Sequence, residues 1–157
     1  MAKKDLSLIL HNIRSSHNVG AIFRTADGAG VSKIYLTGYT PKPIDQFGRP
    51  DKALAKTALG AEKTIAWQYL ASASTLINKL KKSGTEIIAL EQAPDSVDFR
   101  RAKIKWPAAL LLGEEVEGVN KALLKKSDQI IEIPMRGQKE SLNVSVATGI
   151  AVYEILK

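Results

Sequence analysis

The sequence contains no cysteine and only two histidines, His11 and His17, among its 157 residues. Thiol catalysis, disulfides and thiolate metal sites are therefore excluded, and a three-histidine zinc site cannot form. No apolar run approaches the roughly 20 residues that a membrane-spanning helix needs. The apolar patch at 6–10 is also shorter than the about 7–15 apolar residues of a signal peptide. The sequence thus predicts a cytoplasmic protein with no metal and no membrane partner.

The composition that is present suits one globular domain. The apolar fraction is 45% and the charged fraction 25%, both ordinary for a soluble domain. The net charge of +7 is uneven. Residues 1–60 carry nine Lys or Arg and four Asp or Glu, which gives a net charge of +5. Residues 113–157 carry six Lys or Arg and seven Asp or Glu, which gives a net charge of −1. A basic front half favours a polyanionic partner, although solubility alone would also account for such a charge.

Short apolar runs alternate with helical patterns along the chain. Strands are predicted at 6–10, 34–36, 65–67, 86–90, 108–112 and 129–133, and helices near 18–29, 51–61, 72–83, 118–126 and 143–156. The run at 108–112 has no polar alternation, which is typical of a strand covered on both faces. This order predicts an α/β fold with a mostly parallel sheet flanked by helices.

In the first predicted helix, the apolar residues form one stripe and Arg24 lies outside it. Asn18 is a candidate N-cap, and Gly28 and Gly30 are expected to end the helix. Arg24 lies about 100° around the helix from Phe23, off the apolar stripe. That stripe comprises Val19, Ile22, Phe23 and Ala26. We therefore expect Arg24 at the edge of the core, near the strand ends.

The last predicted helix is too apolar for a helix with one covered face. From Leu142 to Leu156, ten of fifteen residues are apolar, and they do not keep to one stripe. Such a helix must be covered on more than one side. A second copy of the chain is the simplest cover, and a central position in a monomer is the alternative.

Residues 38–51 form a long predicted loop that holds three of the six prolines. The loop carries Lys42 and Arg49 beside Tyr39 and Phe47, a mixture suited to phosphates and stacked bases. The alternative is a long surface loop without a binding role.

Three further loops leave the carboxyl ends of predicted strands, where parallel sheets bind ligands: 11–18, 113–120 and 134–143. The middle loop carries Glu114, Glu115 and Glu117, and it matches neither a Walker loop nor a dinucleotide fingerprint. It would repel phosphate but would suit ribose hydroxyls or a cation such as a sulfonium. An acidic helix start favoured by the macrodipole, and ordinary capping by Ser141 and Asn143 in the third loop, are the alternatives.

Three segments of the chain resemble, in order and spacing, the motifs of the SpoU-type RNA 2′-O-methyltransferases of the SPOUT superfamily. They are Asn12 to Gly30, Leu110 to Val119, and Ile131 to Met135 followed by Ser141 to Ala147. The resemblance spans nearly the whole chain. It implies a single SPOUT methyltransferase domain over 1–157, with a C-terminal trefoil knot. It also implies a homodimer with active sites at the interface.

The same resemblance implies the cofactor S-adenosylmethionine and the residues of the site. The matching cofactor positions are Leu90, Gly113, Ile133, Met135, Ser141 and Leu142. The matching catalytic group is Asn18, Arg24, Glu115, Ser141 and Asn143. We take the candidate RNA contacts to be Arg14, His17, Lys42 and Arg49.

The implied reaction is attack of a ribose 2′-hydroxyl of RNA on the sulfonium methyl group. An arginine side chain is ordinarily always protonated, so Arg24 acts either as a base that gives up this proton or as a charged group. In the second case it would hold a phosphate and stabilise the developing alkoxide. We expect tRNA rather than ribosomal RNA as the substrate. The alternatives are a non-catalytic knotted RNA-binding or assembly protein, and a SPOUT base methyltransferase with a carboxylate in place of Arg24.

Overall fold

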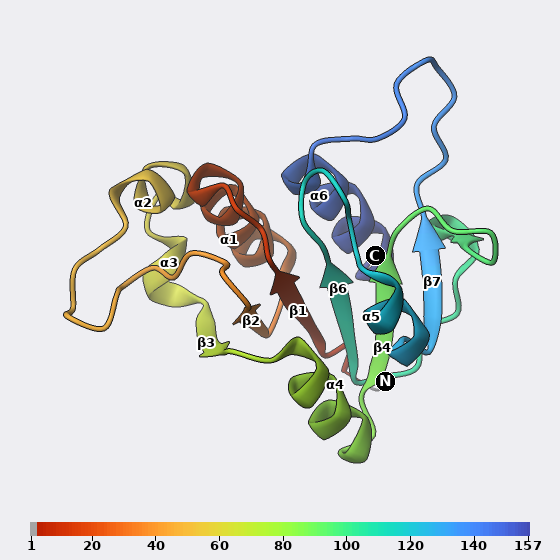
Figure 1. Cartoon of the computed structure of the whole chain (residues 1–157), viewed down its shortest axis with the longest axis horizontal. Helices are drawn as coiled ribbons and strands as arrows, with labels where there is room; N and C mark the ends of the chain where they lie inside the picture. The colour runs from red at the N-terminus through yellow and green to blue at the C-terminus, as the bar shows by residue number, and fades with distance from the viewer. Residues whose placement is uncertain (1–2) are drawn as a thin grey trace.

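A seven-stranded sheet in which every neighbouring pair is parallel runs through the molecule, in the order β3-β2-β1-β6-β4-β7-β5 (Figure 1). The computed structural model describes residues 3–157. The strands are β1 (Leu6–His11), β2 (Lys33–Thr37), β3 (Ala66–Leu70), β4 (Glu86–Leu90), β5 (Val97–Asp98), β6 (Ala108–Leu112) and β7 (Gln129–Glu132). The helices are α1 (Ser16–Ala29), α2 (Lys52–Ala58), α3 (Ala61–Thr64), α4 (Ala73–Lys82), α5 (Lys121–Lys126) and α6 (Val144–Ile155), with a 3₁₀ turn η1 at Phe99–Arg101. The predicted α/β fold with a parallel sheet is confirmed.

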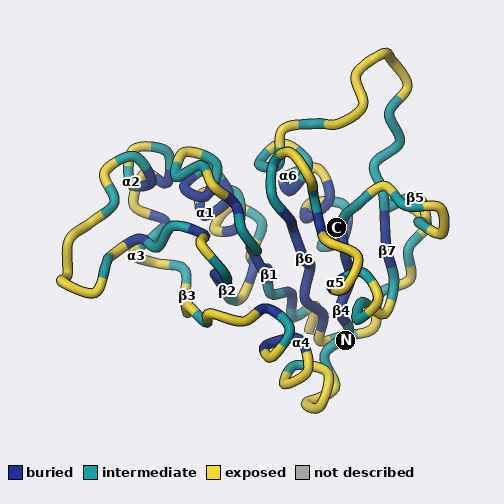
Figure 2. The backbone as a smooth tube through the Cα atoms, in the orientation of Figure 1, coloured by how far each residue is buried: buried dark blue, intermediate teal, exposed yellow. Residues whose placement is uncertain are grey.

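The core lies on both faces of the central strands, which Figure 2 shows as the dark, buried part of the chain. Every residue of β6 is buried, as its unbroken apolar sequence predicts. In β1, Leu8 and Leu10 belong to the cluster that α1 and α6 cover, whereas Ile9 belongs to the cluster that α4 and α5 cover. The alternation of side chains along each strand therefore divides one apolar run between two layers of helices.

Some predicted boundaries differ from the structure for local reasons. The helix expected at 51–61 is two helices, because Leu59 and Gly60 both take left-handed backbone angles, with φ of 51° and 93°. The third strand begins at Ala66 and extends to Leu70. The strand β5 was not predicted, since it has only two residues and pairs with β7 alone.

The start of α1 corrects the prediction for Asn18. Ser15 is the N-cap, and its side chain accepts a hydrogen bond from the amide of Asn18 (3.1 Å), so the side chain of Asn18 is free for another partner. Gly30 ends the helix in a left-handed conformation with φ of 86°. Gly28 lies inside the helix, so the prediction that it helps to end α1 is wrong. The predicted stripe is buried, and Arg24 is exposed.

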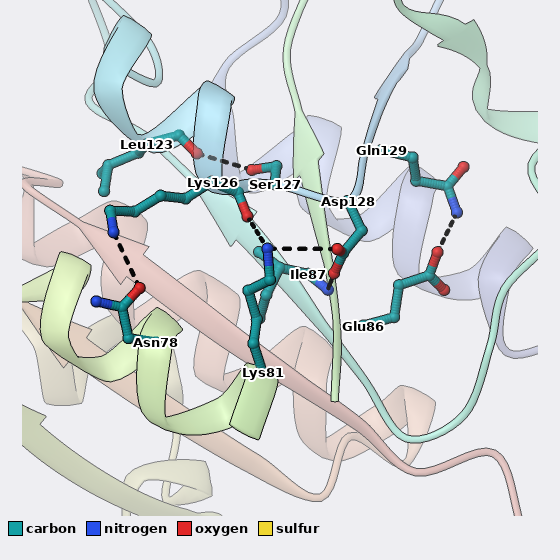
Figure 3. A network of polar contacts seen from close by, with 9 residues as sticks. All are labelled: Asn78, Lys81, Glu86, Ile87, Leu123, Lys126, Ser127, Asp128 and Gln129. Atoms are coloured by element: carbon teal, nitrogen blue, oxygen red, sulfur yellow. Dashed lines mark hydrogen bonds and ion pairs between the residues drawn. The ribbon is translucent and has the colours of Figure 1, made fainter. Parts of the chain in front are cut away.

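A polar network fixes α4 and α5 at the amino ends of the strands (Figure 3). Lys81 Nζ donates to the carbonyl of Lys126 (3.0 Å) and lies 3.5 Å from Asp128 Oδ1. Asp128 Oδ2 in turn accepts from the amide of Ile87 (2.8 Å), which joins the start of β7 to β4. Because β7 is held against β4, and β4 against β6, the carboxyl ends of these three strands lie together at the opposite edge of the sheet.

The helix α6 is covered on one side only. Ala151, Val152 and Ile155 are buried in the core cluster that includes α1, whereas Val146, Ile150 and Tyr153 are 50%, 40% and 56% exposed. The prediction that this helix is apolar on more than one side is confirmed. The C-terminal knot stays a prediction. Within residues 3–157, no helix has the length and hydrophobicity that crossing a membrane requires.

Candidate active site

A pocket lies at the carboxyl ends of β4, β6 and β7. It is lined by residues that follow these strands and by the start of α6, and its walls include all six predicted cofactor positions: Leu90, Gly113, Ile133, Met135, Ser141 and Leu142. These residues come from three loops that are distant in the sequence. The order of the parallel strands brings them together, as expected for ligand sites in this class of sheet.

Two glycines and one carboxylate shape the loop at 113–118. A Cβ on Gly113 would lie 2.3 Å from the carbonyl carbon of Gly118, so no side chain fits there. Gly118 has φ of 70°, and a Cβ on it would lie 1.8 Å from Glu91 Oε2. That same oxygen accepts a hydrogen bond from the amide of Val119 (2.8 Å). Glu91 therefore holds this loop in a conformation that only glycine permits at 113 and 118.

The loop at 134–142 has little internal bonding. Among the described residues, its backbone makes one hydrogen bond, in which Gln92 Nε2 donates to the carbonyl of Glu140 (2.8 Å). Backbone amides and carbonyls must be paired with water or with a ligand when the chain does not pair them. The segment therefore offers a row of backbone donors and acceptors at the pocket wall.

The pocket is acidic. Its lining residues include Glu91, Glu114, Glu115, Glu117 and Glu132, and no Lys or Arg lines it. Such a wall repels the phosphates of a nucleotide and attracts a cation. The predicted acidic ligand loop is therefore part of the pocket.

A hydrogen-bonded chain of side chains joins this pocket to α1 and α6. Glu115 accepts from the amides of Arg14 (3.0 Å) and Ser15 (2.9 Å) and from Asn18 Nδ2 (3.2 Å). Asn143 Nδ2 donates to Asn18 Oδ1 (3.2 Å). Burial raises the pKa of Glu115, but these hydrogen bonds outweigh it and hold the pKa below its ordinary value. The network therefore keeps a carboxylate at the junction of three loops.

The structure brings together four of the five predicted catalytic residues. Asn18, Glu115 and Asn143 form the hydrogen-bonded chain, and Ser141 lines the pocket. Arg24 lies elsewhere, in a shallow hollow between α1, α2 and α6 that also includes Tyr153. Within one chain, Arg24 is therefore not part of the pocket.

Three of the four candidate RNA contacts lie beside aromatic rings. The guanidinium of Arg14 is 5.8 Å from the ring of Tyr39, and Lys42 Nζ is 4.4 Å from the ring of Tyr69. Arg49 lies 4.9 Å from the ring of Phe47 and also pairs with Asp45 (2.9 Å), so part of its charge is neutralised within the loop.

Tyr39 Oη donates to Glu114 Oε2 (2.9 Å), which links this basic and aromatic surface to the pocket wall. His17, the fourth candidate, is exposed in the first turn of α1.

Sequence reasoning missed Glu91, Gln92 and Tyr69. Glu91 and Gln92 directly follow the buried strand at 86–90, so their position at the carboxyl end of a predicted parallel strand was an available signal. Tyr69 had no such signal, because the strand was predicted to end at residue 67.

The chain matches the SpoU rRNA Methylase family over residues 5–153 and belongs to that family. It is 36% identical to a tRNA (guanosine(18)-2′-O)-methyltransferase of Aquifex aeolicus, covering 97% of this chain and 69% of the relative. It is 32% identical to a 23S rRNA (guanosine-2′-O-)-methyltransferase of Ralstonia nicotianae, covering 97% and 58%. The chain therefore spans only part of the length of these relatives.

Among solved structures, an AdoMet-bound rRNA methyltransferase from Sinorhizobium meliloti superposes with a TM-score of 0.87 at 30% identity, covering 98% of this chain and 56% of that one. The resemblance noted from the sequence motifs is thus confirmed at the level of family and fold.

Proposed function

We propose that this protein transfers a methyl group from S-adenosylmethionine to a ribose 2′-hydroxyl of RNA. The observation that carries the proposal is the convergence of all six predicted cofactor positions on one acidic pocket, beside the chain of Glu115, Asn18 and Asn143. Membership of the SpoU family supports it, as do relatives named as tRNA and rRNA 2′-O-methyltransferases.

The residues of the pocket fit this cofactor. Five carboxylates suit the positive charge of a sulfonium and the hydroxyls of a ribose. The sparsely bonded backbone at 134–142 offers donors and acceptors to an adenine ring and an amino-acid group. The glycines at 113 and 118 let this loop pack closely on itself and on Glu91, which fixes the shape of the pocket wall. When bound, S-adenosylmethionine supplies an electrophilic methyl group.

The chain's own side chains would then orient the nucleophile and offset charge. Asn18 is held at both ends, by Glu115 and by Asn143, so its side chain has one orientation. Glu115 stays ionised at neutral pH and offsets positive charge near the methyl group. Arg24 would remain charged, hold the neighbouring phosphate and stabilise the oxygen as its proton leaves. This electrostatic role does not require the guanidinium to act as a base.

We further propose a homodimer in which Arg24 of one copy faces the pocket of the other. Arg24 is outside the pocket of its own chain, and the exposed apolar side of α6 needs cover. Tyr153 belongs both to that side and to the hollow that holds Arg24. A second copy packed on α6 would therefore reach Arg24 as well. The knot of the family is proposed for the C-terminal part.

The basic surface of Arg14, His17, Lys42 and Arg49 is proposed to bind the RNA, with tRNA as the first candidate and the cytoplasm as its location. A non-catalytic RNA-binding role and base methylation are the competing functions.

One experiment separates these three functions. The protein is incubated with labelled cofactor and bulk small RNA, followed by nucleoside analysis, with Arg24→Ala as the control. A labelled 2′-O-methyl nucleoside supports the proposal. A methylated base supports base methylation, and RNA binding without transfer supports the non-catalytic role.

A further inference from the structure

The hollow between α1, α2 and α6 holds two cations and no carboxylate. Arg24 comes from α1 and Lys56 from α2, and the remaining lining residues are Ala21, Thr25, Gly28, Thr57 and Tyr153. In the part of the chain that the structure describes, neither Arg24 nor Lys56 forms an ion pair or a side-chain hydrogen bond. The hollow is therefore a site of unpaired positive charge.

Close packing of α1 on α2 keeps these two cations on neighbouring surfaces. A Cβ on Gly20 would lie 2.1 Å from Thr57 Oγ1 and 2.2 Å from the carbonyl oxygen of Leu54, so the two helices meet without a side chain between them. Thr57 Oγ1 also donates to the carbonyl of His17 (2.8 Å). Arg24 lies one helical turn after Gly20, and Lys56 is the neighbour of Thr57. The contact between the two helices therefore fixes the backbone positions of Arg24 and Lys56 relative to each other.

Two like charges in one hollow repel each other, and an anion between them removes that repulsion. The macrodipole of α2 accounts for a lysine in its last turn, but it does not account for Arg24 in the middle of α1. The hydroxyls of Thr25 and Tyr153 add hydrogen-bond donors at the same place. A planar guanidinium, an ammonium and hydroxyls together match the oxygens of a phosphodiester.

We propose that Lys56, together with Arg24, binds the phosphodiester beside the ribose that is methylated. This inference rests on the proposed function and adds a substrate contact to it. Lys56 then positions the substrate, because it holds a phosphate and leaves the guanidinium of Arg24 directed at that phosphate and at the neighbouring ribose oxygen.

The test compares Lys56→Ala with Lys52→Ala. Lys52 is exposed on the same helix, one turn earlier, and does not line the hollow. Binding of the bulk small RNA fraction is measured at several salt concentrations in the presence of S-adenosylhomocysteine, and cofactor binding is measured by calorimetry. Lys56→Ala should weaken RNA binding about tenfold and reduce the salt slope by roughly one unit. Lys52→Ala should bind RNA like the wild type, and Lys56→Arg should restore most of the affinity.

A double-mutant cycle tests whether both cations hold the same phosphate. If they do, Arg24→Ala combined with Lys56→Ala should lose less RNA affinity than the two single losses together. Additive losses, or an unchanged salt slope in Lys56→Ala, would overturn the assignment even while the wild type methylates RNA. RNA binding without transfer by the wild type would reject the proposed chemistry alone. A wild-type protein that binds no RNA would reject both.

Discussion

Asn143 Nδ2 donates a hydrogen bond to Asn18 Oδ1 across 3.2 Å, joining residues that are 125 positions apart in the chain. The same Asn143 caps α6, because its Oδ1 accepts from the amides of Ser145 (2.8 Å) and Val146 (3.4 Å). One amide side chain thus starts the last helix and orients a residue at the start of the first. The Nδ2 group orients Asn18 and the Oδ1 atom caps α6, so the two roles can be tested separately.

Replacing Asn143 can separate these tasks. In Asn143→Asp the carboxylate still caps α6 but cannot donate to Asn18, so stability should stay near the wild-type value while methyl transfer falls. In Asn143→Ala the cap is lost as well, and unfolding should cost about 1 kcal/mol less. Denaturant titration and a transfer assay check both variants. Wild-type transfer in Asn143→Asp would show that the link to Asn18 has no role in positioning.

Removing Arg24 should separate chemistry from folding and cofactor binding. Arg24 is exposed and outside the cofactor pocket of its own chain, so Arg24→Ala should fold and bind S-adenosylmethionine normally. Methyl transfer should fall by at least about 10²-fold, the usual loss for one charge-stabilising donor. Arg24→Lys should recover part of the rate if only a positive charge is needed. It should recover little if the paired N–H donors of the planar guanidinium are needed. Near-normal transfer by Arg24→Ala would reject the site assignment.

The exposed apolar side of α6 makes a prediction about the oligomer. Ile150 is 40% exposed in the single chain, so Ile150→Asp should leave the fold of each chain intact. In the proposed dimer the same aspartate would be a buried, unpaired charge that costs several kcal/mol. Light scattering should therefore find a folded monomer with little transfer activity. Val97→Asp, on the edge strand β5 and 41% exposed, is the matched control. A fully active Ile150→Asp dimer contradicts the interface.

The lowered pKa of Glu115 predicts acid sensitivity. Because the folded pKa lies below the unfolded value of about 4.3, the carboxylate contributes its full stability above that pH. The contribution is lost as the pH falls from there through the folded pKa. Between about pH 5 and pH 3, the midpoint temperature of thermal unfolding should therefore change less with pH in Glu115→Gln than in the wild type. Glu117→Gln, exposed on the same loop, should keep the wild-type profile. An identical slope in Glu115→Gln would argue against the hydrogen bonds from Arg14, Ser15 and Asn18.

The single hydrogen bond from Gln92 to the loop at 134–142 predicts a change in loop order. Gln92→Glu has the same shape but cannot donate to the carbonyl of Glu140. Trypsin should then cleave faster after Arg136 and Lys139, which are exposed in this loop. Gln138→Glu, in the same loop and outside the pocket, is the control. Equal cleavage of the two variants would mean that Gln92 does not hold the loop.

The sequence by itself determined the class of fold and indicated which segments form the candidate site. Unbroken apolar runs such as 108–112 are typical of strands buried on both faces, and their alternation with helical patterns indicates a parallel sheet. The resemblance to the SpoU-type motifs implied the cofactor positions, and the segments that carry them do line one pocket. Local periodicity also placed Arg24 off the buried stripe of α1. These features depend on neighbouring residues, which a sequence displays directly.

Only the tertiary structure decided which polar groups pair. Asn18 was expected to cap α1, but Ser15 accepts from that amide and the side chain of Asn18 joins Glu115 and Asn143 instead. Glu91 and Gln92 hold two loops that lie far along the chain. Lys56 and Arg24 line the same hollow because α2 packs closely on α1 at Gly20. Such pairs depend on the order of strands and the docking of helices. Since hydrogen bonds need contact within about 3 Å, sequence distance carries no information about them until the fold is formed.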